Sequence, residues 1–283
     1  KAPAPAPGAN GWRFVQGKAG RTLYDSFAAL FPNDEAGKLL ADQLAAHFKR
    51  IFLFKINLAQ DLQPGDEFAF LYEKTEESTD GLRIRAARLT SKGLGQSFEA
   101  YFFKGPGDCC GGHHYDPQGV NVQKHMKNSP IAEYEQVTSL LHDRRPRHEG
   151  VDFKAPIGTP VTLPFAAVVL ETKPRGSRGN GRYIKLRYLE SGKEALFLHL
   201  DAVDPQVVPG RTLKAGAALG TVGNTGHSFA PHLHYQIQLG KRKPLDPYRI
   251  HGTLDRRLPP AAMPEFTAQM ARYKAAMTSE NTK

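Results

Sequence analysis

Cysteine is scarce in this sequence. Only two cysteines occur among 283 residues, and they are adjacent, Cys109 and Cys110. Two neighbouring thiols cannot build a structural zinc cluster by themselves, and they cannot join distant parts of the chain. In an oxidising compartment they would form a vicinal disulfide, and two free thiols in a loop are the alternative. Cysteine content therefore constrains the compartment only weakly.

Long apolar runs are lacking as well. No stretch approaches the ~20 apolar residues that span a bilayer, so we predict no transmembrane segment in this chain. The first residues, Lys1–Gly8, are too polar and too rich in proline for the apolar core of a targeting segment. We interpret residues 1–10 as an extended Ala/Pro-rich linker, and we expect a mature form from which a targeting segment has been removed.

Acidic residues are outnumbered by basic ones. The 28 Asp and Glu residues stand against 38 Lys and Arg, which gives a formal net charge of +10. A basic surface suits polyanions such as nucleic acid, anionic membranes or a cell wall with free carboxylates, although surface charge kept for solubility gives the same composition. The sequence has no aromatic RNP-like strand and no zinc-finger spacing, so we expect no nucleic-acid partner.

The first half combines helical and strand patterns. Apolar residues at helical spacing predict a largely helical segment from Leu23 to Phe48, with Asn33 as an N-cap within it. Residues 104–120 are rich in Gly, Pro, Asp and His, which is typical of a loop. Alternation with a period of two predicts antiparallel strands over residues 52–58, 68–72, 82–86 and 99–103.

The second half is again rich in predicted strands, and a last helix is expected over residues 264–277, with proline in its first turn. The length and the 40% hydrophobic content allow a substantial core in one or two domains. We predict a mainly β (α+β) fold built on antiparallel sheets. The expected segments are the linker 1–10, an accessory domain 11–125, a second domain 126–252 and a C-terminal helical tail 253–283.

The residues suited to chemistry gather in three short segments of the second half. His148 and Asp152 lie four apart, His199 lies within an apolar run, and His232 and His234 lie two apart. Zinc in hydrolases usually takes three protein ligands from His, Asp or Glu and leaves one position for water. No His-Glu-x-x-His arrangement is present, so a glutamate base is not required, and Glu149 is expected to face solvent.

Strand alternation predicts which of these side chains share a face. His232 and His234 should point one way, together with Gln236. His199 should share a face with Phe197 and Ala195, opposite Leu196, Leu198 and Leu200. Each piece alone has an ordinary explanation: a surface His–Asp pair, a chance His-x-His, or a hydrogen-bonded core histidine. Their combination in one β-rich region favours a metal site.

At this point the chain resembles the LytM/lysostaphin-type zinc metallopeptidases. The resemblance covers roughly residues 145 to 250. The matching segments are His148–Val161 (HEGVDFKAPIGTPV), Gly181–Arg187 (GRYIKLR), Leu198–Leu200 (LHL), Val208–Gly216 (VPGRTLKAG), Gly220–Gly226 (GTVGNTG) and Pro231–Tyr235 (PHLHY).

The resemblance implies a division of roles. The positions of His148, Asp152 and His234 correspond to zinc ligands, and those of His199 and His232 correspond to catalytic histidines. It also implies an antiparallel β-sheet core with a substrate groove. Zinc would acidify a bound water and polarise the scissile carbonyl, while the two further histidines would activate the water and stabilise the oxyanion.

The first half resembles, less specifically, an accessory domain found ahead of the peptidase in Gram-negative members. The matching segments are Phe54–Phe68, Ile84–Arg88, Glu99–Tyr101 and Tyr115–Gly119. Two departures stand out. The run Cys109–His114 has no counterpart in the pattern, and Ser139–Arg144 stands where a Ser-x-Phe-Gly-like turn is expected, which changes that wall of the groove.

The sequence therefore predicts a zinc endopeptidase that hydrolyses peptide cross-links of bacterial peptidoglycan, with the D-alanine to diaminopimelate bond as the expected target. Its partners would be peptidoglycan stem peptides, and its location the cell envelope, either periplasmic or secreted. Three alternatives remain open: a secreted protease acting on proteins, a non-enzymatic regulator of cell-wall amidases, and a polyanion-binding module with a structural zinc. A structural site normally has four protein ligands, whereas three are counted here.

Overall fold

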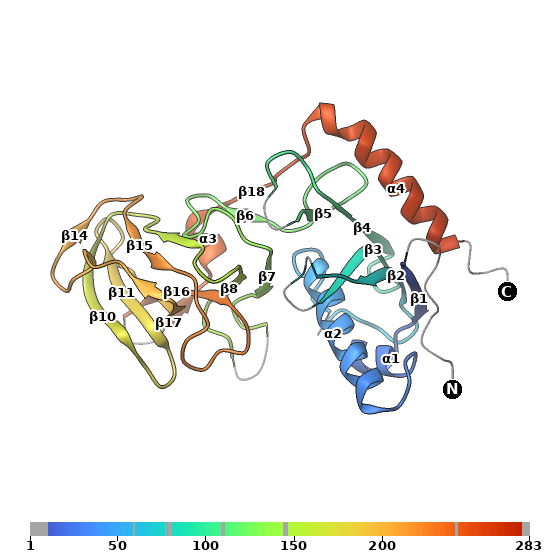
Figure 1. Cartoon of the computed structure of the whole chain (residues 1–283), viewed down its shortest axis with the longest axis horizontal. Coiled ribbons are helices and arrows are strands. Elements are labelled where there is room, and N and C mark those ends of the chain that lie inside the picture. Colours follow the sequence, from blue (N-terminus) through green and yellow to red (C-terminus); the bar gives the residue numbers. More distant parts are fainter. Residues whose placement is uncertain are drawn as a thin grey trace. The chain divides into compact units, whose positions relative to one another are not determined.

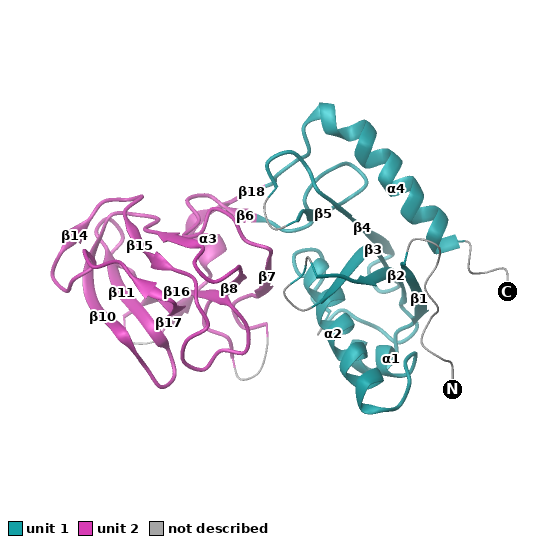
Figure 2. Cartoon of the chain, viewed as in Figure 1, with its two compact units in different colours: residues 1–124, 255–283 teal, residues 125–254 magenta. Residues whose placement is uncertain are grey.

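The computed structural model describes residues 11–58, 60–76, 78, 81–108, 111–143, 147–240 and 243–278. It divides into two compact units: unit 1 joins residues 1–124 to residues 255–283, and unit 2 comprises residues 125–254 (Figure 2). The C-terminal segment, expected as a tail of its own, thus groups with unit 1. The expected linker at residues 1–10 and the pair Cys109–Cys110 lie outside the described residues. None of the described helices combines the length and the apolar character that crossing a membrane requires.

Unit 1 is built on an antiparallel five-stranded sheet with the strand order β1-β2-β3-β4-β5 (Figure 1). Its helices are α1 (Leu23–Ala28), α2 (Glu35–Ile51) and α4 (Met263–Thr278), with a short 3₁₀ turn at Pro260–Ala262. The strands are β1 (Arg13–Lys18), β2 (Glu67–Lys74), β3 (Leu82–Ser91), β4 (Gln96–Phe103) and β5 (His113–Tyr115).

Both faces of this sheet are buried. Alternation along β2 directs Phe70 to one face, where its ring contacts Phe27 of α1 and Phe48 of α2 at centroid distances of 5.0 and 5.7 Å. The opposite face carries Leu71, which belongs to the apolar cluster around Phe266 of α4. The helices thus cover the sheet on two sides, which removes apolar area from water on each.

Two local expectations for this unit are wrong. The helical segment is interrupted, and α2 is capped by Asp34 instead of Asn33: the Asp34 carboxylate accepts a hydrogen bond from the Gly37 N–H at 2.7 Å. A carboxylate is favoured there because it meets the positive end of the helix dipole. Residues 52–58 form turns instead of a strand, and the Ile56 N–H donates to the Phe52 carbonyl at 3.1 Å. Their apolar alternation reflects burial in the core without a strand partner.

Unit 2 contains a larger antiparallel sheet with the order β14-β10-β11-β12-β16-β8-β7, and β17 also pairs with β16 (Figure 1). The chain adds a three-stranded sheet, β13-β15-β9, a two-stranded one, β18-β6, and helix α3 (Pro247–His251). The strands are β6 (His125–Met126), β7 (Gln136–Ser139), β8 (Val151–Lys154), β9 (Pro160–Thr162), β10 (Ala167–Ser177), β11 (Gly181–Tyr188), β12 (Glu194–Leu200), β13 (Ala202–Val203), β14 (Thr212–Leu213), β15 (Ala218–Thr221), β16 (His232–Leu239), β17 (Lys243–Leu245) and β18 (Thr253–Leu254).

One face of the large sheet packs on the core. Tyr235 of β16 pairs with Phe197 of β12 and is fully buried. Its hydroxyl lies 2.6 Å from that of Tyr188 and 2.8 Å from Nε2 of His251 in α3. The predicted mainly β fold with antiparallel sheets and a C-terminal helix is confirmed. The other face of β16 is polar, because the alternate residues His232, His234, Gln236 and Gln238 point away from this core.

Candidate metal centre

Two paired strands and the turn before them bring together His148, Asp152 and His234. In the antiparallel pairing of β8 with β16, Asp152 lies directly opposite His234. Residues opposite each other in such a ladder carry their side chains on the same face. His148 precedes β8 by three residues, and its ring lies against that of His234 with a centroid distance of 4.9 Å. All three side chains are buried.

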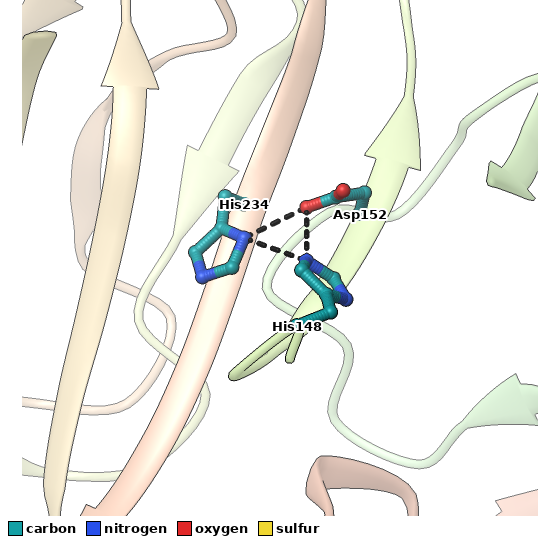
Figure 3. Close-up of side chains that lie close together, drawn as sticks. All are labelled: His148, Asp152 and His234. Carbon is teal, nitrogen blue, oxygen red and sulfur yellow. Dashed lines mark hydrogen bonds and ion pairs between the residues drawn. The ribbon is translucent and has the colours of Figure 1, made fainter. Parts of the chain in front are cut away.

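Three side-chain atoms converge at this point (Figure 3). Oδ1 of Asp152 lies 2.7 Å from Nδ1 of His234 and 3.0 Å from Nε2 of His148, and the two nitrogens are 3.1 Å apart. Two imidazole nitrogens and one carboxylate oxygen form the donor set that zinc takes in catalytic sites. Since all these atoms lie within 4.8 Å of one another, the residues fit a single metal ion.

A backbone carbonyl fixes the orientation of the His148 ring on the side away from Asp152 and His234. Its Nδ1 lies 2.9 Å from the carbonyl oxygen of Leu140. A carbonyl can only accept, so Nδ1 donates to it, and Nε2 is the ring nitrogen that is directed toward Asp152 and His234 and would bind a metal ion. A hydrogen bond of this kind is the usual support of a metal-binding imidazole.

The turn that carries Leu140 is closed by Asp143. One carboxylate oxygen of Asp143 accepts from the Leu140 N–H at 2.9 Å, and the other accepts from the Ser139 hydroxyl at 2.6 Å. Ser139 is in turn the partner of Asp152 in the pairing of β7 with β8. The segment Ser139–Asp143, which departs from the expected sequence pattern, therefore supports both His148 and Asp152.

His199 reaches the site in a way that alternation did not predict. The pairing places Leu198 opposite His234 and Phe197 opposite Tyr235, so a regular strand would direct His199 to the core face. The backbone of His199 instead has φ +64°, and the pairing of β11 with β12 is irregular beside it. The expected face for His199 is therefore wrong. Its ring turns to the polar face and lies 4.8 Å from that of His232.

The two further histidines are each held by a carbonyl. Nδ1 of His199 lies 2.9 Å from the carbonyl oxygen of Thr225, and Nδ1 of His232 lies 2.8 Å from that of Ala230. Both Nδ1 atoms therefore carry the proton, which leaves both Nε2 atoms as bases. Nε2 of His232 lies 3.8 Å from Oδ1 of Asp152. Ser228 adds a contact of 3.1 Å to Nδ1 of His232.

The pKa values of Asp152 and His199 are both lowered, but for different reasons. Burial opposes ionisation of Asp152, but hydrogen bonding to His148 and His234 outweighs it and holds the pKa of the carboxyl well below its usual range. Burial, followed by the neighbouring His232, lowers the pKa of His199 to about 4. His199 is therefore a neutral imidazole at neutral pH, able to accept a proton at Nε2.

Several supporting residues were missed by sequence reasoning. A Cβ at Gly150 would clash with the Tyr235 carbonyl oxygen and lie 2.9 Å from Nε2 of His234, so glycine is required between His148 and Asp152. Its place between two candidate ligands was the available signal. The carbonyls of Leu140 and Thr225 had none, because any residue supplies a carbonyl. Glu149 is exposed, as expected.

Comparison with known proteins matches this region to one family. Residues 146–247 match the model of peptidase family M23, so this part of the chain is similar to a peptidase domain. Similar proteins include two from Vibrio cholerae. One, named peptidoglycan DD-endopeptidase ShyA, is 27% identical over 76% of this chain and 49% of its own length. The other, peptidoglycan DD-endopeptidase ShyC, is 31% identical over 66% of this chain and 43% of its own length. The chain thus spans about half or less of these curated relatives.

Solved structures with weaker overall likeness include two peptidases. A zinc-containing peptidase from Vibrio cholerae is 22% identical over 83% of this chain and 70% of its own, with a TM-score of 0.38. The antimicrobial peptidase lysostaphin from Staphylococcus simulans is 30% identical over 41% of this chain and 48% of its own, also with a TM-score of 0.38.

Proposed function

We propose that this chain is a zinc-dependent endopeptidase that hydrolyses the peptide cross-links of bacterial peptidoglycan, with the bond between D-alanine and diaminopimelate as its target. The observation that carries the proposal is the buried convergence of His148, Asp152 and His234. The names of the Vibrio cholerae relatives support the substrate class. The proposed setting is the cell envelope, either the periplasm or outside the cell.

In this proposal His148, Asp152 and His234 hold the zinc ion. When bound, zinc supplies an acidified water and a Lewis acid for the scissile carbonyl. The low pKa of Asp152 keeps its carboxylate charged and suited to a cation over the working pH range. The Leu140 carbonyl holds the His148 ring so that Nε2 is directed toward the same point. The chain therefore presents one carboxylate oxygen and two imidazole nitrogens as donors.

His199 and His232 handle protons and the oxyanion. With Nδ1 of each bonded to a backbone carbonyl, Nε2 of each faces the site. A neutral Nε2 accepts a proton from the attacking water, and the resulting N–H donates to the developing oxyanion or to the leaving amine. The lowered pKa of His199 suits it to the accepting role, because the imidazole is unprotonated before reaction.

The complete candidate ligand set argues against a purely regulatory role, since a regulator needs no metal donors. We also propose that residues 11–125 form an accessory domain to the peptidase. The test of the main proposal is mass spectrometry of muropeptides released from purified sacculi. Zinc-loaded protein should convert cross-linked dimers to monomers that end in D-alanine. Chelated protein and the His234→Ala variant should release none, and release by chelated protein would contradict the proposal.

A further inference from the structure

Strands β10 and β11 form a hairpin (Figure 1). Positive charge is concentrated toward the tip of this hairpin. Residues 173–182 read KPRGSRGNGR, with four basic residues and no acidic one. Nearer the sheet the basic groups are paired: Lys173 lies 3.4 Å from Glu171, and Arg182 lies 3.5 Å from Asp201. Arg175 and Arg178 are exposed, and neither has an ion-pair partner among the residues that the structure describes.

This tip is docked on the segments that hold the candidate catalytic histidines. The carbonyl of Asn180 accepts from the His199 N–H at 3.0 Å, and the carbonyl of Gly179 accepts from the His227 N–H at 2.8 Å. The approach is close enough that a Cβ at Gly226 would lie 2.6 Å from the Gly179 carbonyl oxygen. The position of Arg178, the residue before Gly179, is therefore fixed relative to the polar face.

An exposed aromatic residue lies in the segment around His227, to which the hairpin tip is hydrogen-bonded. Phe229 is 91% exposed, and its ring lies 5.5 Å from that of His227. The residue between them, Ser228, contacts Nδ1 of His232. Unpaired arginines and exposed aromatic rings are the side chains that binding surfaces use most. Here Phe229 follows Ser228, which contacts His232, and Arg178 precedes the two residues whose carbonyls bind the His199 and His227 amides.

We propose that Arg175, Arg178 and Phe229 form the surface that receives a carboxylate-bearing part of the substrate beside His199 and His232. The guanidinium group is a planar fork that matches a carboxylate with two hydrogen bonds, and a neighbouring ring contributes apolar contact. Free carboxylates are the anionic groups of peptidoglycan stem peptides, so charge complementarity selects the stem peptide. The inference rests on the proposed function and adds the groups that recognise its substrate.

The test compares two double charge reversals in the full-length, zinc-loaded protein. The first is Arg175→Glu with Arg178→Glu. The control is Lys214→Glu with Arg249→Glu, which changes the net charge equally at two exposed positions. Lys214 follows β14, which pairs with the opposite end of β10, and Arg249 lies on α3 behind the core face. Zinc content and circular dichroism verify that both variants are folded and loaded.

The substrates are soluble cross-linked muropeptides, either native or with their carboxylates converted to amides. The hairpin variant should raise KM for native substrate by about 5- to 10-fold, as expected for two exposed charge contacts, and leave kcat within about 2-fold. For wild-type protein, amidation of the substrate should raise KM by a similar factor. For the hairpin variant, amidation should raise KM little further, because the charge contacts are already lost. Phe229→Ser should raise KM by about 3-fold with zinc retained, since one exposed apolar contact is lost.

Two results would overturn the inference. One is a control variant that raises KM as much as the hairpin variant. The other is an equal penalty for the hairpin variant on native and amidated substrate, which would indicate attraction to polyanions in general. Failure of the proposed function is a different result: wild-type, zinc-loaded protein would then cleave neither substrate.

Discussion

Nδ1 of His148 lies 2.9 Å from the carbonyl oxygen of Leu140, so a backbone group eight residues away sets the direction of a candidate metal ligand. That carbonyl is itself held, because the Asp143 carboxylate accepts from the Leu140 N–H. The geometry of the metal centre thus depends on a turn that contributes no ligand. This dependence can be measured.

Replacing Asp143 should weaken zinc binding without removing a ligand. Asp143→Ala leaves the Leu140 N–H and the Ser139 hydroxyl without their acceptor, and the zinc dissociation constant should rise by about 10- to 100-fold, the usual effect of losing a support of a ligand. Asp143→Asn keeps one amide oxygen as an acceptor and should retain most of the affinity. The measurement is competition with a chromophoric chelator.

A matched control for this change is Asp204→Ala. Asp204 also closes a turn with its carboxylate, accepting from the Gln206 N–H at 2.8 Å, but within the described part of the chain it contacts none of the candidate ligands. Equal zinc affinities for Asp143→Ala and Asp204→Ala would show that the turn does not position His148.

Zinc content and turnover should distinguish the candidate ligand His234 from the candidate catalytic residue His232, which lies two positions earlier. His234→Ala removes a donor nitrogen from the convergent set, so zinc content and activity should both be lost. His232→Ala and His199→Ala should retain zinc and lower turnover by roughly 100- to 10,000-fold, the scale of losing a general acid or base. Elemental analysis beside turnover assays checks this. Loss of zinc from His232→Ala together with its retention in His234→Ala would invert the assignment.

Gly150→Ala should destabilise unit 2 strongly, although it adds only one methyl group. The added Cβ would meet the backbone carbonyl of Tyr235, which cannot move without displacing β16. We expect the free energy of unfolding to fall by about 1–3 kcal/mol, as for other overpacked sites, with weaker zinc binding. The control is Gly179→Ala, where a Cβ meets nothing within 4 Å. Calorimetry of both variants checks the prediction, and equal melting temperatures would contradict it.

The stability of unit 1 should depend on pH through His114. Burial, the largest cause, lowers the pKa of His114 to about 3. In the unfolded chain the group titrates near 6.5, so the unfolded state binds the extra proton first as the pH falls. Stability from the neutral ring is fully present above pH ~6.5 and is lost below it, at about 1.4 kcal/mol per pH unit until the folded pKa is reached.

His114→Gln isolates this contribution. The ring Nε2 of His114 lies 2.8 Å from the Ile84 carbonyl, and an amide N–H can replace that donor without titrating. Urea unfolding followed by fluorescence of Trp12, which lies in unit 1, should show a flatter pH dependence in the variant between pH 6.5 and 4. The same slope in both proteins would exclude His114 as its source.

Much of this protein follows from patterns that are local in the sequence. The period-two alternation over residues 68–72 predicted the strand that the structure shows as β2, because successive side chains of a strand must point to opposite faces. The His-x-His spacing likewise predicted that His232 and His234 share a face of β16, and the structure has them so. The turns at residues 52–58 show the limit: the same alternation arose there without a strand, since burial alone selected the apolar residues.

The sequence by itself determined the donor types, their spacing and the antiparallel β architecture. Only the tertiary structure decided on which face of the sheet His199 lies. Side chains alternate between faces only while the strand is regular, and at His199 the backbone has φ +64° and the pairing of β11 with β12 is irregular. The side chain of His199 therefore lies on the face opposite to the one that alternation predicts. Only the tertiary structure decided which carbonyls hold the imidazoles, since Leu140 and Thr225 supply a group that every residue has. The tertiary structure also decided that the C-terminal helix packs on the sheet of unit 1. Phe266 and Tyr273 of this helix are buried there against apolar residues that lie more than a hundred positions earlier in the chain.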